Sequence, residues 1–178
     1  IYISHKDEDG DWREPEKLAG INPPLDEISV FVHPDGETVY FSSNGYEGHG
    51  GFDIFSAKLK RKDNTFEITE IKNVSSANTF RNEKYPLYFT LSGSTCFYNF
   101  TAGKNHYVYS CPKPPVKPVP VFYYSAEVDD ELTGKPVKDA VAEYKSQAQG
   151  FTEKKPVFSD GFTGTVIRKI MKYTLTVS

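Results

Sequence analysis

An internal repeat constrains the fold of this chain more than any other feature of its sequence. Three short apolar segments that each end in Ser begin at residues 1, 53 and 107, that is, 52 and 54 residues apart. The second and third segments each follow a similar hairpin, at residues 28–43 and 85–99, in which a Gly-containing turn separates two apolar runs. A repeat of about 40 to 55 residues with several strands is typical of the blades of a β-propeller.

The repeat predicts one complete four-stranded antiparallel blade at residues 26–75, in which a Pro-Asp-Gly turn at 34–36 joins the first two strands. Its strands, the first of them innermost, are expected near residues 28–33, 38–43, 53–59 and 66–72. Residues 1–18 are expected to form the last two strands of the preceding blade, and residues 84–111 the first three strands of the following one. Two isolated blades cannot bury both faces of their sheets, so the sequence predicts either a fragment or a ring that other blades complete.

The composition favours strands and argues against binding to nucleic acid. Aromatic residues make up 15% of the chain, with 12 Tyr and 13 Phe, and these side chains are enriched in strands. Basic and acidic residues are interspersed and the net charge is −3, so no extended positive surface is expected. No run of residues approaches the roughly 18 apolar residues of a membrane-spanning helix.

The composition changes abruptly at residues 112–120, which contain five prolines. Such a segment favours extended polyproline geometry and is predicted to be a short, semi-rigid linker between domains at residues 1–111 and 121–178. In the second domain, apolar residues at alternate positions of the first and last strands predict a small β-sandwich. Its core is expected to contain Phe122, Tyr124, Ala126 and Val128 from the first strand, and Tyr173, Leu175 and Val177 from the last.

Two segments resemble ligand-binding loops but lack essential residues. Asp7, Asp9 and Asp11 resemble the start of a calcium-binding loop, yet position 12 of that loop is Leu18 rather than Glu. A solvated hairpin turn is expected there instead. The Gly-rich stretch at residues 45–51 lacks the pattern of a phosphate-binding loop. It is expected to be a connection whose glycines adopt positive φ and which Asp53 braces through backbone hydrogen bonds.

The sequence indicates no catalytic residues, no metal site and no cofactor. Its histidines lie in or beside predicted strands or turns without a nucleophile motif, and a strand-end role is expected for the second of them. They are His5, His33, His49 and His106. Cys96 and Cys111 lie on the two strands of one predicted hairpin, almost opposite each other. A cross-strand disulfide and a pair of buried free thiols are both compatible with this placement.

The repeat resembles a known family. Its motifs are Trp-Arg-Glu-Pro at 12–15, His-Pro-Asp-Gly at 33–36, Val-Tyr-Phe-Ser-Ser at 39–43 and Gly-His-Gly-Gly-Phe-Asp-Ile-Phe at 48–55. This series resembles the TolB-type WD-like β-propeller repeat of OmpA-family envelope proteins. Residues 120–178 resemble the carboxypeptidase regulatory-like domain, a transthyretin-like β-sandwich whose name implies no peptidase activity.

The resemblance implies a non-catalytic periplasmic scaffold attached to the outer membrane. In that family, propeller and sandwich lie between an upstream helical-repeat or lipoprotein segment and a downstream OmpA-like domain that binds peptidoglycan. One such architecture is an accessory lipoprotein of the type IX secretion and gliding machinery, so the implied partners are outer-membrane or periplasmic proteins engaged in protein transport. Trp12, Tyr46 and Phe52 are the aromatic candidates for contact surfaces. The alternative is a propeller module that binds a glycan or a peptide.

Overall fold

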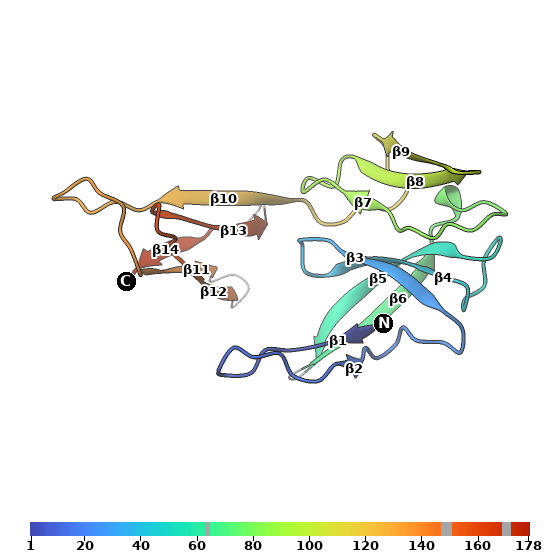
Figure 1. Cartoon of the computed structure of the whole chain (residues 1–178), viewed down its shortest axis with the longest axis horizontal. Helices are drawn as coiled ribbons and strands as arrows, with labels where there is room; N and C mark the ends of the chain where they lie inside the picture. Colours follow the sequence, from blue (N-terminus) through green and yellow to red (C-terminus); the bar gives the residue numbers. More distant parts are fainter. Residues whose placement is uncertain (63–64, 147–150, 169–171) are drawn as a thin grey trace. The chain divides into compact units, whose positions relative to one another are not determined.

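The computed structural model describes residues 1–62, 65–146, 151–168 and 172–178, and over these ranges the protein is all-β. The strands form five small antiparallel sheets, and the helical content of these ranges is the single 3-10 turn η1 (Ser75–Ala77). Nothing helical in the described ranges has the length and apolarity needed to cross a bilayer. The chain divides into two compact units, residues 1–119 and 120–178 (Figure 1).

The predicted four-stranded antiparallel sheet forms in the first unit, with its strands side by side in chain order. They are β3 (Glu27–Val32), β4 (Thr38–Ser43), β5 (Asp53–Lys62) and β6 (Thr65–Asn73). The predicted turn joins β3 to β4: the Gly36 amide donates to the His33 carbonyl at 3.0 Å, and Gly36 has a φ of +73°, which a side chain would strain. The Asp35 carboxylate fixes this turn by accepting hydrogen bonds from the amides of Glu37 and Thr38, at 2.9 and 2.8 Å.

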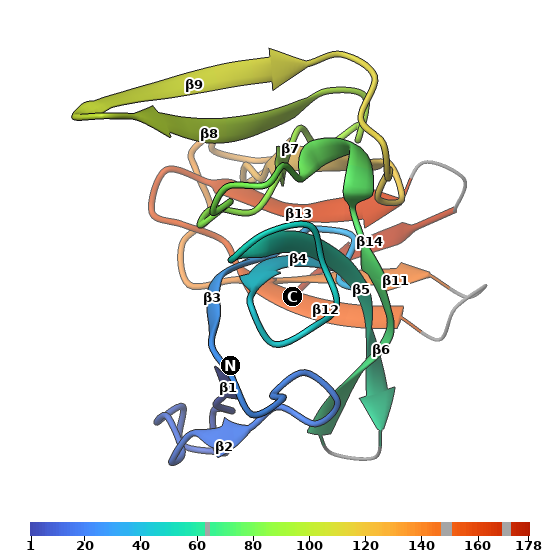
Figure 2. The same ribbon diagram turned by 90° about the vertical axis from the view of Figure 1, so that its right-hand side faces the viewer.

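A smaller sheet lies on each side of this central sheet (Figures 1 and 2). One is the pair of β1 (Tyr2–Ile3) and β2 (Glu16–Lys17). The other contains β7 (Tyr88–Phe89), β8 (Cys96–Ala102) and β9 (Asn105–Cys111), in that order. The two strands expected before the complete sheet and the three expected after it are therefore present.

Both faces of the central sheet are covered, which explains why β4 is buried at every position. One face packs against residues that follow β2, and the other packs against the sheet of β7, β8 and β9. The first cluster contains Leu18, Ile21, Val39, Phe41, Phe55, Ala57 and Ile68. The second contains Tyr40, Ile54, Val74, Leu87, Phe89 and Cys96. Successive residues of β4 thus enter different cores, because side chains alternate between the two faces of a strand.

The Pro-rich segment belongs to the first unit as far as Val119. Val116 packs against the second core cluster, and its carbonyl accepts a hydrogen bond from the Tyr40 hydroxyl at 3.3 Å. The Val119 amide donates to Asp35 Oδ2 at 2.9 Å. These contacts hold the segment against the first unit, where the composition alone predicts a semi-rigid spacer.

The second unit contains two sheets. One pairs β10 (Val121–Glu127) with β13 (Phe162–Arg168). In the other, β11 (Val141–Ser146) lies between β12 (Phe151–Pro156) and β14 (Thr174–Val177). The sheets meet at Tyr144, whose hydroxyl donates to Thr163 Oγ1 at 3.3 Å and whose ring lies edge-on to that of Tyr124, with centroids 6.3 Å apart.

The core of the second unit differs from the one that alternation predicts. Val128 and Leu175 pack against it as expected. Phe122, however, is 41% exposed, because the buried residue at this end of β10 is Val121. The centre of the core comes instead from β11. The sequence gives no signal for β12, because its polar residues do not alternate with apolar ones and it ends in a proline.

Candidate functional site

The segment with the three aspartates near the start of the chain, Asp7, Asp9 and Asp11, forms a hairpin turn, as predicted. The Asp7 carboxylate accepts hydrogen bonds from the amides of Asp9 and Asp11, at 3.1 and 2.9 Å. This turn brings Lys6 opposite Trp12, a residue that is 69% exposed. The Lys6 ammonium lies 5.2 Å from the centroid of the Trp12 ring, within the range of a cation–π interaction. The turn therefore presents an aromatic surface next to a positive charge.

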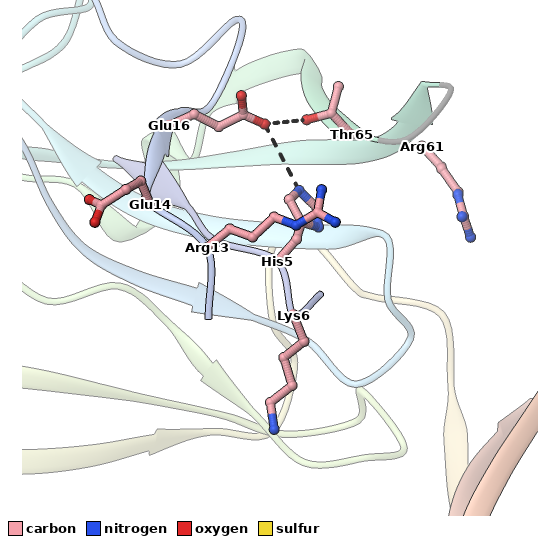
Figure 3. Close-up of a pocket in the computed structure, with 7 residues that line it drawn as sticks. All are labelled: His5, Lys6, Arg13, Glu14, Glu16, Arg61 and Thr65. Atoms are coloured by element: carbon pink, nitrogen blue, oxygen red, sulfur yellow. Dashed lines mark hydrogen bonds and ion pairs between the residues drawn. The ribbon is translucent and has the colours of Figure 1, made fainter. Parts of the chain in front are cut away.

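An open, polar pocket of about 660 Å³ lies beside this hairpin (Figure 3). Its lining comes from the segment around β1 and β2 and from the ends of β5 and β6. The lining residues are His5, Lys6, Arg13, Glu14, Glu16, Arg61 and Thr65. Because residues far apart in the sequence line it together, only the packing of the first two sheets creates this pocket.

Glu16 is the centre of the contacts inside the pocket. Its Oε1 accepts a hydrogen bond from the Thr65 hydroxyl at 3.0 Å and lies 4.0 Å from His5 Nε2. The His5 ring stacks on Phe66, with centroids 6.0 Å apart. The pocket lining contains three cationic side chains and two carboxylates. Figure 3 shows that the carboxylate of Glu14 is directed away from that of Glu16. Mixed charge in an open pocket suits a polar peptide or saccharide, which offers both donors and acceptors.

The other two aromatic candidates lie elsewhere, so the structure does not unite the three in one surface. Tyr46 packs against the first core cluster, with its ring centroid 5.2 Å from that of Phe55. Burial, and to a smaller extent the charge of Glu27, raise the pKa of Tyr46 above its usual value. Phe52 is half-buried in the loop before β5, and its amide donates to Asn82 Oδ1 at 3.1 Å. Of the three, only Trp12 adjoins the pocket, through Lys6.

The Gly-rich loop at residues 45–51 is braced by Asp53 as predicted, but its glycines serve a different purpose from the one expected. Asp53 Oδ2 accepts hydrogen bonds from the amides of His49 and Gly50. The four glycines of the loop do not have positive φ. They are required by close approach: a Cβ on Gly48 would lie 1.6 Å from Asp53 Oδ2, and one on Gly51 would lie 2.0 Å from an oxygen of Asn82.

Sequence reasoning missed a row of exposed aromatic side chains on β8 and β9. The rings of Tyr98 and Tyr109 stack with centroids 5.4 Å apart, and Tyr107 lies 6.3 Å from Tyr109. Each of the three is more than a third exposed. The signal for this surface was present in β9, which alternates Tyr with smaller residues and contains no charged residue apart from a histidine.

The structure places Cys96 and Cys111 directly opposite each other, as the hairpin predicts. Both are free thiols, Cys96 buried and Cys111 half-buried. Burial, together with the neighbouring Cys111 thiol, raises the pKa of Cys96 to about 11. Cys96 therefore holds very little reactive thiolate at neutral pH.

We expect iodoacetamide at mildly alkaline pH to alkylate Cys111 at least about tenfold faster than Cys96, because alkylation requires an accessible thiolate. Peptide mass spectrometry over a time course measures both rates in the folded protein. A denatured sample, in which both thiols are exposed, is the control and should give similar rates. Equal rates in the folded protein would contradict the described environment of Cys96.

No protein-family model, curated protein or solved structure matches this chain. Within the described ranges, no three His, Cys, Asp or Glu side chains lie close enough together to hold a metal ion.

Proposed function

We propose that this chain is part of a non-catalytic scaffold of the bacterial cell envelope, built from neighbouring blades of a β-propeller followed by a small β-sandwich. The observation that carries the proposal is the packing of the central sheet between the segment that precedes it and the segment that follows it. Successive blades of a propeller pack face to face in chain order, so this arrangement is the one expected of neighbouring blades. The Tyr144–Thr163 contact between the two sheets of the second unit supports a sandwich in the same way.

In this proposal the scaffold works by protein–protein contact in the periplasm, attached to the outer membrane. The exposed Trp12 and the adjoining polar pocket supply one contact surface, since exposed aromatic residues next to cations are common anchors at interfaces. The proposed partners are outer-membrane or periplasmic proteins of a secretion or gliding machinery of the type IX class. Attachment to peptidoglycan is assigned to an OmpA-like domain outside this chain.

A second candidate function is binding of a glycan or a peptide, and the pocket favours it. Saccharides stack on exposed indole rings and bind carboxylate and guanidinium groups through their hydroxyls. The lining of the pocket contains such groups, on Arg13 and Glu16. The Trp12 ring is next to the pocket, because it contacts Lys6, which is also a lining residue. The two functions differ in the partner bound at the same surface.

A photo-cross-linking amino acid at position 12 of the full-length protein in living cells tests the proposal. We expect the cross-linking amino acid, in place of Trp12, to form discrete adducts with proteins that fractionate with the outer membrane. Position 132 is the matched control, because Leu132 is 95% exposed but lies in the second unit, far along the chain from the pocket.

Adducts of the same proteins from both positions would mean random collision and would contradict a specific surface at Trp12. Adducts with cytoplasmic proteins would contradict the envelope location. Absence of protein adducts, together with binding of soluble peptidoglycan fragments that Trp12→Ala weakens at least about tenfold in calorimetry, would replace the scaffold with the glycan-binding alternative.

A further inference from the structure

The outer edge of β9 carries backbone hydrogen-bonding groups that lack a partner strand. Among the described residues, β9 pairs only with β8 and forms the edge of its sheet (Figure 2). The repeat places residues 107–110 in register with residues 53–56 of β5, and β5 has β6 on its outer side. Over the part of the chain that the structure describes, the sheet of β9 therefore lacks a counterpart of β6. The segment that follows, residues 112–120, cannot supply one, because its five prolines have no amide hydrogen to donate.

The hairpin geometry shows which groups point outward. Gly103 and Lys104 form a two-residue turn that closes on the pair Ala102 and Asn105. That pair is hydrogen-bonded across the hairpin, and such pairs alternate with non-bonded ones along an antiparallel ladder. Tyr107 and Tyr109 thus direct their amides and carbonyls toward β8. The groups of the alternate residues point to the free edge, and these residues are His106, Val108 and Ser110.

Three other edge strands of the protein, β3, β6 and β12, carry features that prevent pairing with another strand. β3 has a register shift and a positive φ at Ser29. β6 has a register shift, a positive φ at Glu70 and two further charged residues. β12 contains three charged residues and ends at Pro156. β9 has none of these: its register with β8 is continuous, and it contains no Asp, Glu, Lys, Arg or Pro.

We propose that β9 pairs antiparallel with β9 of a second copy of this chain, about a two-fold axis that passes between the two Val108 residues. In this register Val108 faces Val108 of the second copy, and His106 faces Ser110. These are the residues whose groups point outward, so each pair exchanges two backbone hydrogen bonds. Two three-stranded sheets then join into one continuous sheet across the axis.

The side chains of β9 suit this self-pairing. The sequence Tyr-Val-Tyr at 107–109 is symmetric about its centre, so Tyr107 lies opposite Tyr109 of the second copy on the face that already carries the Tyr98–Tyr109 stack. Val108, which is 71% exposed in the single chain, is covered by its equivalent on the other face. The pairing of the two β9 strands brings no like charges face to face, because β9 contains no Asp, Glu, Lys or Arg and its histidine, His106, faces Ser110.

Charge substitution at position 108 tests both the dimer and its register. Light scattering of the purified chain over a concentration series is expected to give a mass that rises toward twice 20.1 kDa. Val108→Lys and Val108→Glu should each weaken the dimer at least about tenfold, because the two like charges face each other across the axis. The matched control Val108→Thr keeps a β-branched, uncharged side chain and should dimerise within about threefold of the parent.

An equal mixture of Val108→Lys and Val108→Glu should recover the dimer, because opposite charges then face each other. This recovery also shows that the two variants are folded. A parent chain that stays at the mass of one chain throughout the series would overturn the proposal. So would a dimer that either charged variant leaves intact, or a mixture that recovers nothing. The readout is the mass of the pure protein and does not depend on the proposed envelope function.

Discussion

Tyr144→Ala is expected to unfold residues 120–178 and to leave the sheets of the first unit folded. Tyr144 is 1% exposed and is the one large side chain in a core cluster whose other buried members are Ala140, Ala142 and Val157. It also provides one of the contacts between the two sheets, through its hydrogen bond to Thr163. The clusters of the first unit share no residue with this one.

The cost of Tyr144→Ala is comparable to the whole free energy of unfolding of the second unit. Truncation of a buried aromatic side chain to alanine costs about 3 to 5 kcal/mol. At roughly 0.05 to 0.15 kcal/mol per residue, a unit of this size has a free energy of unfolding of about 3 to 9 kcal/mol. The substitution therefore removes at least about a third of the stability of the second unit, and all of it if that stability lies in the lower part of this range.

Limited proteolysis followed by mass spectrometry measures this effect, since cuts should appear throughout residues 120–178 and spare the first unit. Tyr123→Ala is the matched control: Tyr123 is 62% exposed, and its loss should change stability by less than about 0.5 kcal/mol. Leu175→Asp, which buries a charge against the same core, should reproduce the result. Simultaneous loss of both units would show that residues 1–178 unfold cooperatively as one.

The fold was predictable wherever local chemistry and the repeat indicated the same structure. The Pro-Asp-Gly turn and the non-alternating apolar run of β4 located the central sheet, because a turn residue with positive φ and a strand buried on both faces leave strong patterns. The hairpin register that places Cys96 opposite Cys111 followed in the same way. β12 left no such pattern, because an edge strand exposed to solvent needs no apolar alternation.

The candidate site was predictable only in part, because it is made by packing between distant segments. Trp12 is exposed, whereas Tyr46 packs against the first core cluster. The pocket joins His5 and Glu16 to Thr65, and no spacing in the sequence predicts that contact. The side chains that approach the glycines of the loop at residues 45–51 come from residues outside the loop, and no sequence pattern shows which side chains these are.

Asp35→Ala is expected to destabilise the first unit by about 3 kcal/mol, because it removes a buried carboxylate that holds several chain segments together. Besides the amides of its own turn, Asp35 accepts hydrogen bonds from the Thr38 hydroxyl at 2.6 Å and from the Val119 amide at 2.9 Å. Without the carboxylate these donors stay buried and unsatisfied. The Asp35 amide itself donates to Nδ1 of the buried His33, whose Nε2 lies 3.3 Å from the Thr90 carbonyl, so the turn also positions β7.

The pH dependence of the stabilisation by Asp35 distinguishes the contribution of its charge from the contribution of its packing. Burial acts to raise the pKa of Asp35, but hydrogen bonds from Thr38, Glu37 and Val119 outweigh it and hold the pKa below its ordinary value. A group whose pKa is lower in the folded state stabilises the protein above its unfolded pKa, near 3.9, and this contribution is lost as pH falls through the folded value.

The unfolding temperature of Asp35→Asn should therefore lie furthest below that of the parent near neutral pH, and the difference should shrink below about pH 4. His33, a side chain in contact with Asp35, is present in both proteins, so the difference between them reports the carboxylate together with its interaction with His33. Thermal unfolding followed by circular dichroism across this pH range measures it. A difference that stays constant down to the acid limit would show that Asp35 acts through packing alone and that its charge contributes nothing to the turn.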